Sequence, residues 1–346
     1  MAPKWILRKG TKAGGFRYSR PDGRPIRGKD TLGRIDALRI PPAWRDVHVA
    51  ANPRAPIQVW GLDARGRKQY RYHARAVEKG ERRKHYRVRQ MAKELPAIRK
   101  KLLKDFRRRG FPEEKICAGI VLLISEAFMR TGSDRYEREN NTFGITTIRK
   151  SHVSFENDRL FFDYVAKRSI QRRQFIVSER MIRFVESLMA TPGPRLFRYQ
   201  YDGGWMDVDS REVNEYLQRV AKFPYTAKDL RTWGGTLRAA TWLADQPPAR
   251  SPSARKKNVL MAVRSVASEL GNTPAICRKS YVHPAVLARY LKNGAIIEVP
   301  DGRARRRAEW ENTAEEEALI EFLDRHFPER RTDPRGRALS EAESAA

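Results

Sequence analysis

Tyr281 lies near the end of the stretch E-L-G-N-T-P-A-I-C-R-K-S-Y-V-H-P, residues 269–284. Glycine commonly ends a helix, and threonine followed by proline commonly begins one. The stretch therefore predicts a helix that ends at Gly271 and a new one capped by Thr273. The new helix must stop before the final proline, because the residue ahead of a proline is disfavoured in the α region. Tyr281 then occupies the last turn of a short helix, with Asn272 at the junction upstream. Tyr281 is either a half-buried residue, with its ring in the core and its hydroxyl in solvent, or a reactive phenol.

Two basic residues stand at the ends of predicted elements. Apolar residues at helical spacing predict a core helix over 113–131, which delivers Arg130 at its C-terminal end. Lys167 falls at the tip of a predicted β-hairpin. An arginine at a helix C-terminus can simply offset the helix dipole, and a lysine at a hairpin tip can simply face solvent. Taken alone, the position of either residue fits such a structural role as well as it fits a functional one.

A third cation, Arg231, belongs to the segment T-A-K-D-L-R-T-W-G-G. Thr226 and Asp229 have the spacing of a capping box, so a helix begins there. Lys228 and Arg231 then lie in its first turns, where positive charge works against the helix dipole. That local cost hints that an anion binds nearby. The two glycines that follow each cost a helix ~1 kcal/mol relative to alanine, which indicates close helix packing.

These five residues are the groups needed to break a phosphodiester without a metal ion. We hypothesise that Tyr281 attacks a backbone phosphorus, forms a phosphotyrosine and releases a 5′-hydroxyl. A phenol with a pKa near 10 needs an electropositive site to react at neutral pH. Arg130 and Arg231 would bind the non-bridging oxygens, and Asn272 would add a neutral donor. Lys167 would protonate the leaving oxygen as general acid.

The charge of the chain favours a polyanionic partner. Of 346 residues, 71 are Lys or Arg and 41 are Asp or Glu, a formal net charge of +30. Nucleic acid suits this charge better than an anionic membrane surface. We expect an intracellular protein, since no apolar run approaches the ~20 residues of a membrane span and no signal peptide is evident. Cys117 and Cys277 suggest neither a disulfide nor a zinc site. Asp207 and Asp209 favour N-capping over magnesium binding, so we expect no metal or other cofactor.

The N-terminal part is strand-like and contains two turn signals. R-P-D-G-R-P at 20–25 predicts a hairpin turn, and I-Q-V-W-G-L followed by Q-Y-R-Y predicts a second hairpin. In Q-Y-R-Y, alternation places Gln69 on one face and Tyr70 and Tyr72 on the other. The strand is either an edge strand with an aromatic core face or a groove-facing strand. In the second case glutamine would pair with adenine and tyrosine would contact sugar or phosphate.

The remainder predicts a mainly helical domain. A basic stretch, 71–109, should form two helices divided by Pro96, and strands should follow the helix over 113–131. Further helices are expected at 178–190, 209–221, 254–270, 284–292 and 310–327, with a basic turn at 303–307. The predicted fold class is α+β. It combines an N-terminal β domain (1–78), a mainly α-helical domain (79–327) with a small three-stranded sheet at about 143–177, and a disordered tail (328–346).

The ordered motifs F-M-R-T-G, V-A-K, K-D-L-R-T-W and L-G-N-T-P-A-I-C-R-K-S-Y-V-H-P resemble type IB DNA topoisomerases, specifically the bacterial poxvirus-like branch. The N-terminal I-P-P-A-W-R-D-V and G-L-D-A-R-G-R-K-Q-Y-R-Y-H are also similar to that branch, so the resemblance covers about residues 35–295. It implies ATP-independent relaxation of supercoiled DNA through a 3′-phosphotyrosyl intermediate, by a monomer that closes as a C-shaped clamp around duplex DNA. It also implies a cytoplasmic enzyme of the bacterial nucleoid.

The family pattern makes Arg130, Lys167, Arg231, Asn272 and Tyr281 the catalytic five. It places Gln69, Tyr70, Tyr72, Tyr136 and Lys228 on DNA. Two departures stand out. Ala166 precedes Lys167 where relatives often carry glycine, and Asn272 stands where the viral enzymes use histidine. Since Asn272 carries no charge, we expect slower cleavage than by an enzyme with histidine there. We also expect the short helix that bears Tyr281 to be displaced or mobile without DNA.

Two other functions fit part of the sequence. A tyrosine recombinase shares the helical catalytic fold and the tyrosine nucleophile. Recombinases usually carry histidine three residues before their second arginine, where this chain has Lys228, and they normally lack such a β domain. A non-catalytic nucleoid-binding protein would fit the charge, but it would not account for K-D-L-R-T-W or G-N-T-P with S-Y-V.

Overall fold

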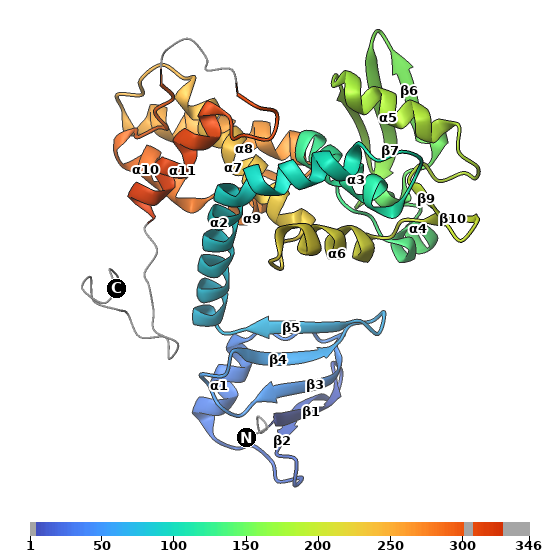
Figure 1. Ribbon diagram of the computed structural model, residues 1–346. Coiled ribbons are helices and arrows are strands. Elements are labelled where there is room, and N and C mark those ends of the chain that lie inside the picture. The colour runs from blue at the N-terminus through green and yellow to red at the C-terminus, as the bar shows by residue number, and fades with distance from the viewer. Residues whose placement is uncertain (1–4, 301–306, 328–346) are drawn as a thin grey trace, which may run out of the picture. The chain divides into compact units, whose positions relative to one another are not determined.

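The computed structural model describes residues 5–300 and 307–327. The chain divides into two compact units between Lys84 and His85, a few residues beyond the boundary expected at 78. The first unit is mostly strand and the second mostly helix (Figure 1), which confirms the α+β fold class. The predicted basic turn at 303–307 lies almost wholly outside the described residues, and the predicted tail at 328–346 lies wholly outside them.

The first unit is a five-stranded antiparallel sheet with the strand order β2-β1-β3-β4-β5. Its elements are β1 (Trp5–Thr11), β2 (Gly15–Ser19), α1 (Lys29–Ala37), β3 (Arg45–Ala50), β4 (Ile57–Leu62) and β5 (Lys68–Tyr72). The hairpin between β4 and β5 is the one that the sequence predicted. The segment 20–25 turns as expected but does not join two strands of the sheet, because the β1–β2 hairpin closes earlier, between Thr11 and Gly15. Helix α1 was not predicted.

The two faces of this sheet differ. One face forms a small core with α1, in which Ile6, Val49 and Val59 pack on Ile35. The opposite face carries aromatic side chains in register, since His48 pairs with Trp60 and Trp60 with Tyr70. His48 stacks on Trp60 with ring centroids 3.9 Å apart. The strand β5 lies at an edge of the sheet, and all of its residues except the half-buried Gln69 are exposed.

Helix α2 (Ala74–Phe106) begins in the first unit and continues into the second as one helix of 33 residues. The prediction that Pro96 divides this stretch was wrong. Proline removes the N–H that would bond the carbonyl four residues earlier, here Ala92. The Asn312 side chain donates to that carbonyl from far along the chain (3.3 Å), which compensates for the missing bond. Local sequence carries no sign of this partner.

The second unit surrounds α3 (Glu113–Ala127), whose apolar stripe is buried as expected. The elements that follow α3 are α4 (Asp134–Asn140), η1 (Ile145–Thr147), η2 (Lys150–His152), β6 (Val153–Glu156), β7 (Arg159–Ala166), β8 (Ile170–Ile176), α5 (Glu179–Met189), β9 (Arg198–Tyr201), β10 (Gly204–Asp207), α6 (Ser210–Ala221), α7 (Ala227–Ala244), α8 (Pro252–Leu270), α9 (Pro274–Ser280), α10 (Pro284–Asn293) and α11 (Ala314–His326). None of the helices in the described ranges is long and apolar enough to cross a membrane.

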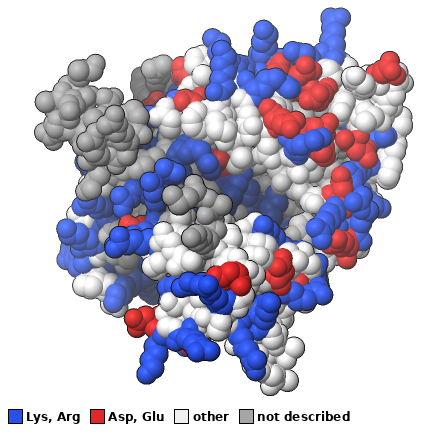
Figure 2. Space-filling model, turned by 90° about the horizontal axis from the view of Figure 1, so that it is seen from below, with Lys and Arg blue, Asp and Glu red and all other residues white. Residues whose placement is uncertain are grey.

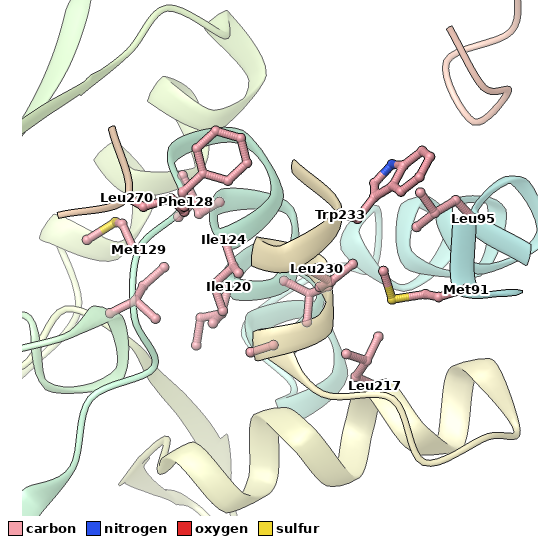
Figure 3. Close-up of a cluster of buried hydrophobic side chains, with 14 of the residues drawn as sticks. Met91, Leu95, Ile120, Ile124, Phe128, Met129, Leu217, Leu230, Trp233 and Leu270 are labelled. Carbon is pink, nitrogen blue, oxygen red and sulfur yellow. The ribbon is translucent and has the colours of Figure 1, made fainter. Parts of the chain in front are cut away.

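Helix α7 lies at the centre of this core. Leu230 and Trp233 of α7 face Met91 and Leu95 of α2 (Figure 3), and all four side chains are buried. Helix α7 also packs on α8. The helix that positions Arg231 is therefore fixed on several sides.

The three-stranded sheet β6-β7-β8 confirms the predicted strand pairing. Asn157 and Asp158, the two residues between β6 and β7, both have positive φ, the conformation that a tight two-residue hairpin requires. The sheet begins at Val153 rather than near 143. Residues 145–147 form a 3-10 turn instead, and α4 was not predicted. Asp209 caps α6 as expected, accepting from the N–H groups of Arg211 and Glu212.

Candidate active site

The junction between α8 and α9 has the conformation that the sequence predicts. Gly271 ends α8 at φ 63°, and the Asn272 N–H bonds back to the Ala267 carbonyl (2.9 Å). Thr273 then caps α9, its hydroxyl accepting from the Ile276 N–H (3.3 Å). This double stop and start turns the last carbonyls of α8 and the Asn272 side chain toward the same region.

Arg130 reaches this junction because α3 ends earlier than predicted. Phe128 adopts the left-handed conformation (φ 52°), which stops the helix at Ala127 and redirects the chain. The next residues are held by 144–147, where the Ile145 N–H donates to the Arg130 carbonyl (2.7 Å). Arg130 Nη2 then donates to the Gly271 carbonyl and to Asn272 Oδ1, both at 2.7 Å.

Arg231 approaches the neighbouring carbonyl, that of Leu270, from α7. Its helix starts with the predicted capping box, in which the Thr226 N–H donates to Asp229 (2.9 Å). Arg87 of α2 also donates to Asp229 (2.6 Å) and so ties the start of α7 to α2. Arg231 is 3% exposed, and its Nη2 donates to the Leu270 carbonyl (3.0 Å). The negative end of the α8 dipole thus offsets the repulsion between the two arginines.

Two buried donors at this site are unsatisfied. Arg231 Nη1 and Asn272 Nδ2 make no hydrogen bond within the described residues. Leaving a buried donor unpaired costs about 1–3 kcal/mol, more when it is charged. Because Asn272 Oδ1 accepts from Arg130, the amide is oriented with Nδ2 as the open donor. Two such donors on neighbouring residues are suited to the oxygens of a bound anion.

Tyr281 lies beside the arginines. It ends α9, its N–H donates to the Cys277 carbonyl (2.9 Å), and its half-buried ring has the Arg231 guanidinium carbon 5.5 Å from its centroid. The structure places Tyr281 beside Arg231. The expectation that its short helix is displaced or mobile without DNA stays a prediction. The backbone explains this placement, since the Thr236 hydroxyl donates to the Tyr281 carbonyl (3.3 Å) and fixes α9 against α7.

The pKa values of the two arginines reflect their burial at this site. Burial is the largest effect on both Arg130 and Arg231 and lowers the pKa of each, while the nearby Tyr281 phenol partly raises it. An anion bound between the two would relieve the cost of burying their charges. The site is thus an electropositive cluster next to a phenol.

Lys167 is the one member of the five that stands apart. It lies at the tip between β7 and β8, as predicted, and its side chain is exposed. Within the described part of the chain, Lys167 forms no hydrogen bond or ion pair. The structure thus brings together Arg130, Arg231, Asn272 and Tyr281 and leaves Lys167 on the neighbouring hairpin.

The expected DNA contacts lie at the surface. Tyr136 on α4 is 46% exposed, Lys228 at the start of α7 is exposed, and Tyr70 and Tyr72 are 40% and 53% exposed. Gln69 faces the other way and donates to Asp63 (2.9 Å). Hydrogen bonds from Arg67 and then from Gln69 lower the pKa of Asp63 to about 2. Lysine and arginine side chains are widespread on the face drawn in Figure 2.

Two residues near the site were missed from the sequence. Arg172 of β8 donates to the Ser268 and Glu269 carbonyls, both at 2.7 Å. Tyr164 of β7 is buried, with a pKa raised by burial and lowered in part by Arg172, Arg231 and Arg130. Strand alternation would have placed both on the inner face of the hairpin, but it could not have shown what they face. Among the described residues, no group of three or more His, Cys, Asp or Glu is arranged to hold a metal ion.

Comparison with known proteins identifies the family. Residues 73–301 match the family model for the catalytic core of eukaryotic DNA topoisomerase I. Residues 15–63 match the model for the N-terminal domain of bacterial DNA topoisomerase IB. A DNA topoisomerase 1B of Acanthamoeba polyphaga mimivirus is 33% identical over 270 residues, which cover 76% of this chain and 80% of that protein. The chain belongs to the type IB DNA topoisomerases.

More distant relatives agree with this assignment. A DNA topoisomerase I of monkeypox virus is 23% identical and a DNA topoisomerase 1B of vaccinia virus (strain Copenhagen) is 24% identical. Each match covers 66% of this chain and 70% of the viral protein. Among solved structures, a XerH site-specific recombinase bound to palindromic difH aligns with 55% of this chain and 48% of its own. Its TM-score of 0.35 and 15% identity are too low to support an inference.

Proposed function

We propose that this topoisomerase relaxes supercoiled DNA by cutting one strand, allowing rotation and resealing it, with Tyr281 as the nucleophile. The observation that carries the proposal is the cluster of Arg130, Arg231 and Asn272 beside Tyr281, with two buried donors unsatisfied. Such donors stabilise charge as it develops on a phosphate in the transition state, without reorganisation.

In the proposed cleavage step, Tyr281 Oη forms a bond to phosphorus while the bond from phosphorus to the 5′ oxygen breaks. The phenol loses its proton to solvent, and Lys167 donates a proton to the departing 5′ oxygen. The 3′ end then remains on Tyr281 as a phosphodiester. Because one diester replaces another of similar energy, resealing needs no ATP.

We also propose that the enzyme acts as a monomer that clamps one duplex on the bacterial nucleoid. The match of residues 15–63 to a bacterial domain and the net charge of +30 support this. On the first unit, the edge strand β5 is suited to enter a major groove edge-on, so that Tyr70 and Tyr72 reach the backbone. Gln69 could then read a base only by giving up its bond to Asp63.

The test is relaxation of supercoiled plasmid in EDTA without ATP. We expect activity from the wild-type protein, none from Tyr281→Phe, and a denaturant-trapped adduct at a DNA 3′ end. A wild-type protein that fails to relax DNA, or a Tyr281→Phe variant that still does, would refute the proposal. An adduct at a 5′ end would indicate a different class of enzyme.

A further inference from the structure

The end of α8 is bound by a third arginine that the proposed chemistry does not use. Arg172 Nη1 donates to the Ser268 carbonyl and Nη2 to the Glu269 carbonyl, each at 2.7 Å. Arg231 and Arg130 take the next two carbonyls, those of Leu270 and Gly271. Arginines thus bind the last three carbonyls of α8 and the carbonyl of its C-cap, Gly271. These arginines come from β8, α7 and the segment after α3.

The Arg172 fork fits this helix end closely. A Cβ atom on Gly271 would lie 3.2 Å from Arg172 Cζ and Nε, so the guanidinium rests directly on the glycine. A planar fork can bond two carbonyls at once, whereas a lysine would offer one point charge. The negative end of the α8 dipole adds a favourable charge interaction. This contact is therefore specific for arginine.

Arg172 also belongs to the hairpin that carries Lys167. In the β7–β8 pairing Arg172 stands opposite Tyr164, and Tyr164 is three residues before Lys167 in the chain. At ~3.4 Å per residue, the anchor and the tip are only ~10 Å apart along the strand. A second anchor, Gln174, donates to the Ala127 carbonyl at the end of α3 (2.5 Å) and holds the base of the hairpin. Arg172 is the anchor nearer the tip.

We propose that Arg172 is a positioning residue that docks the β7–β8 hairpin onto the end of α8 and so places Lys167 over the scissile phosphate. The inference rests on the proposed function. Arg130, Arg231 and Asn272 are held by other contacts, so losing Arg172 should affect the step that needs Lys167 more than the others. That step is protonation of the leaving 5′ oxygen.

A change of leaving group separates this role from a general structural one. When sulfur replaces the bridging 5′ oxygen at a mapped cleavage site, the thiolate departs without protonation. We expect Arg172→Ala to slow single-turnover cleavage of the ordinary duplex by about 10²-fold, within the range of general acid catalysis. Cleavage of the sulfur-substituted duplex should stay within about 3-fold of wild type, since the acid is not needed there. Arg172→Lys should be slowed on the ordinary duplex as well.

Two controls make the result decisive. Arg173→Ala removes the neighbouring arginine, which faces outward and pairs with Glu156 (2.8 Å), and it should cleave both duplexes like wild type. The double variant Lys167→Ala/Arg172→Ala should be no slower than Lys167→Ala alone. Equal slowing of Arg172→Ala on both duplexes, including a complete loss through misfolding, would overturn the inference, as would no slowing at all. If wild type forms no adduct with either duplex, the proposed function itself fails.

Discussion

At the scale of single residues, we expect Asn272 to bind the phosphate directly. Its Oδ1 accepts from Arg130, and its Nδ2 is a buried donor that is unsatisfied within the described residues. The amide thus holds an arginine through its oxygen and presents its nitrogen as a free donor for a ligand. A histidine in this place would supply a donor that can also carry charge.

Substitution at this position can separate the two roles. Asn272→Asp keeps an acceptor for Arg130, and even strengthens it, but it removes the open donor and adds negative charge. We expect cleavage to slow by about 10²–10³-fold, the usual cost of losing one such donor, whereas Asn272→His should stay active. The measurement is the single-turnover rate of adduct formation. An aspartate variant as fast as wild type would mean that Asn272 only holds Arg130.

At the scale of elements, the sequence predicts what is encoded locally. The end of α8 at Gly271 and the start of α9 at Thr273 follow from two or three adjacent residues, and both are confirmed. The same holds for the capping box at Thr226 and the hairpins of β6–β7 and β7–β8. The four assembled site residues were also named in advance, on motif spacing and family resemblance rather than on geometry.

What escaped prediction depends on distant partners. Pro96 remains inside α2 because Asn312 bonds the carbonyl that proline leaves open. Strand alternation puts Arg172 and Arg173 on opposite faces of the hairpin, but it does not show that one binds α8 and the other pairs with Glu156. The placement of Tyr281 beside Arg231 likewise depends on how α9 packs on α7. No local pattern reports such contacts.

The packing of α7 on α9 gives a prediction of its own. A Cβ atom on Gly235 would lie 2.9 Å from the Tyr281 carbonyl oxygen and 3.1 Å from Leu270 Cδ1. Helix propensity alone predicts that Gly235→Ala stabilises α7 by ~1 kcal/mol. We expect the opposite, a loss of about 1–3 kcal/mol through overpacking, with cleavage at least about 10-fold slower because Tyr281 is pushed away from the arginines.

Gly80→Ala on α2 is the matched control, since a Cβ atom there meets nothing within 4 Å. Urea unfolding and single-turnover cleavage should show the control unchanged or slightly stabilised and fully active. If Gly235→Ala were stabilised and equally active, Gly235 would have no part in placing Tyr281.

At the scale of the whole molecule, each of the two units has its own core, and the four assembled site residues and Lys167 all lie in the second. The first unit should then contribute DNA affinity rather than chemistry.

Each phosphate that a protein neutralises adds ~0.9 to the slope of log affinity against log salt. A fragment that starts at α2, residues 74–346, should still form the Tyr281 adduct in low salt but bind with a shallower slope than the full chain. Fluorescence anisotropy of a labelled duplex over a salt series measures both slopes. Identical slopes would mean that the first unit neutralises no phosphates. A fragment that forms no adduct in low salt would mean that the first unit contributes to the chemistry.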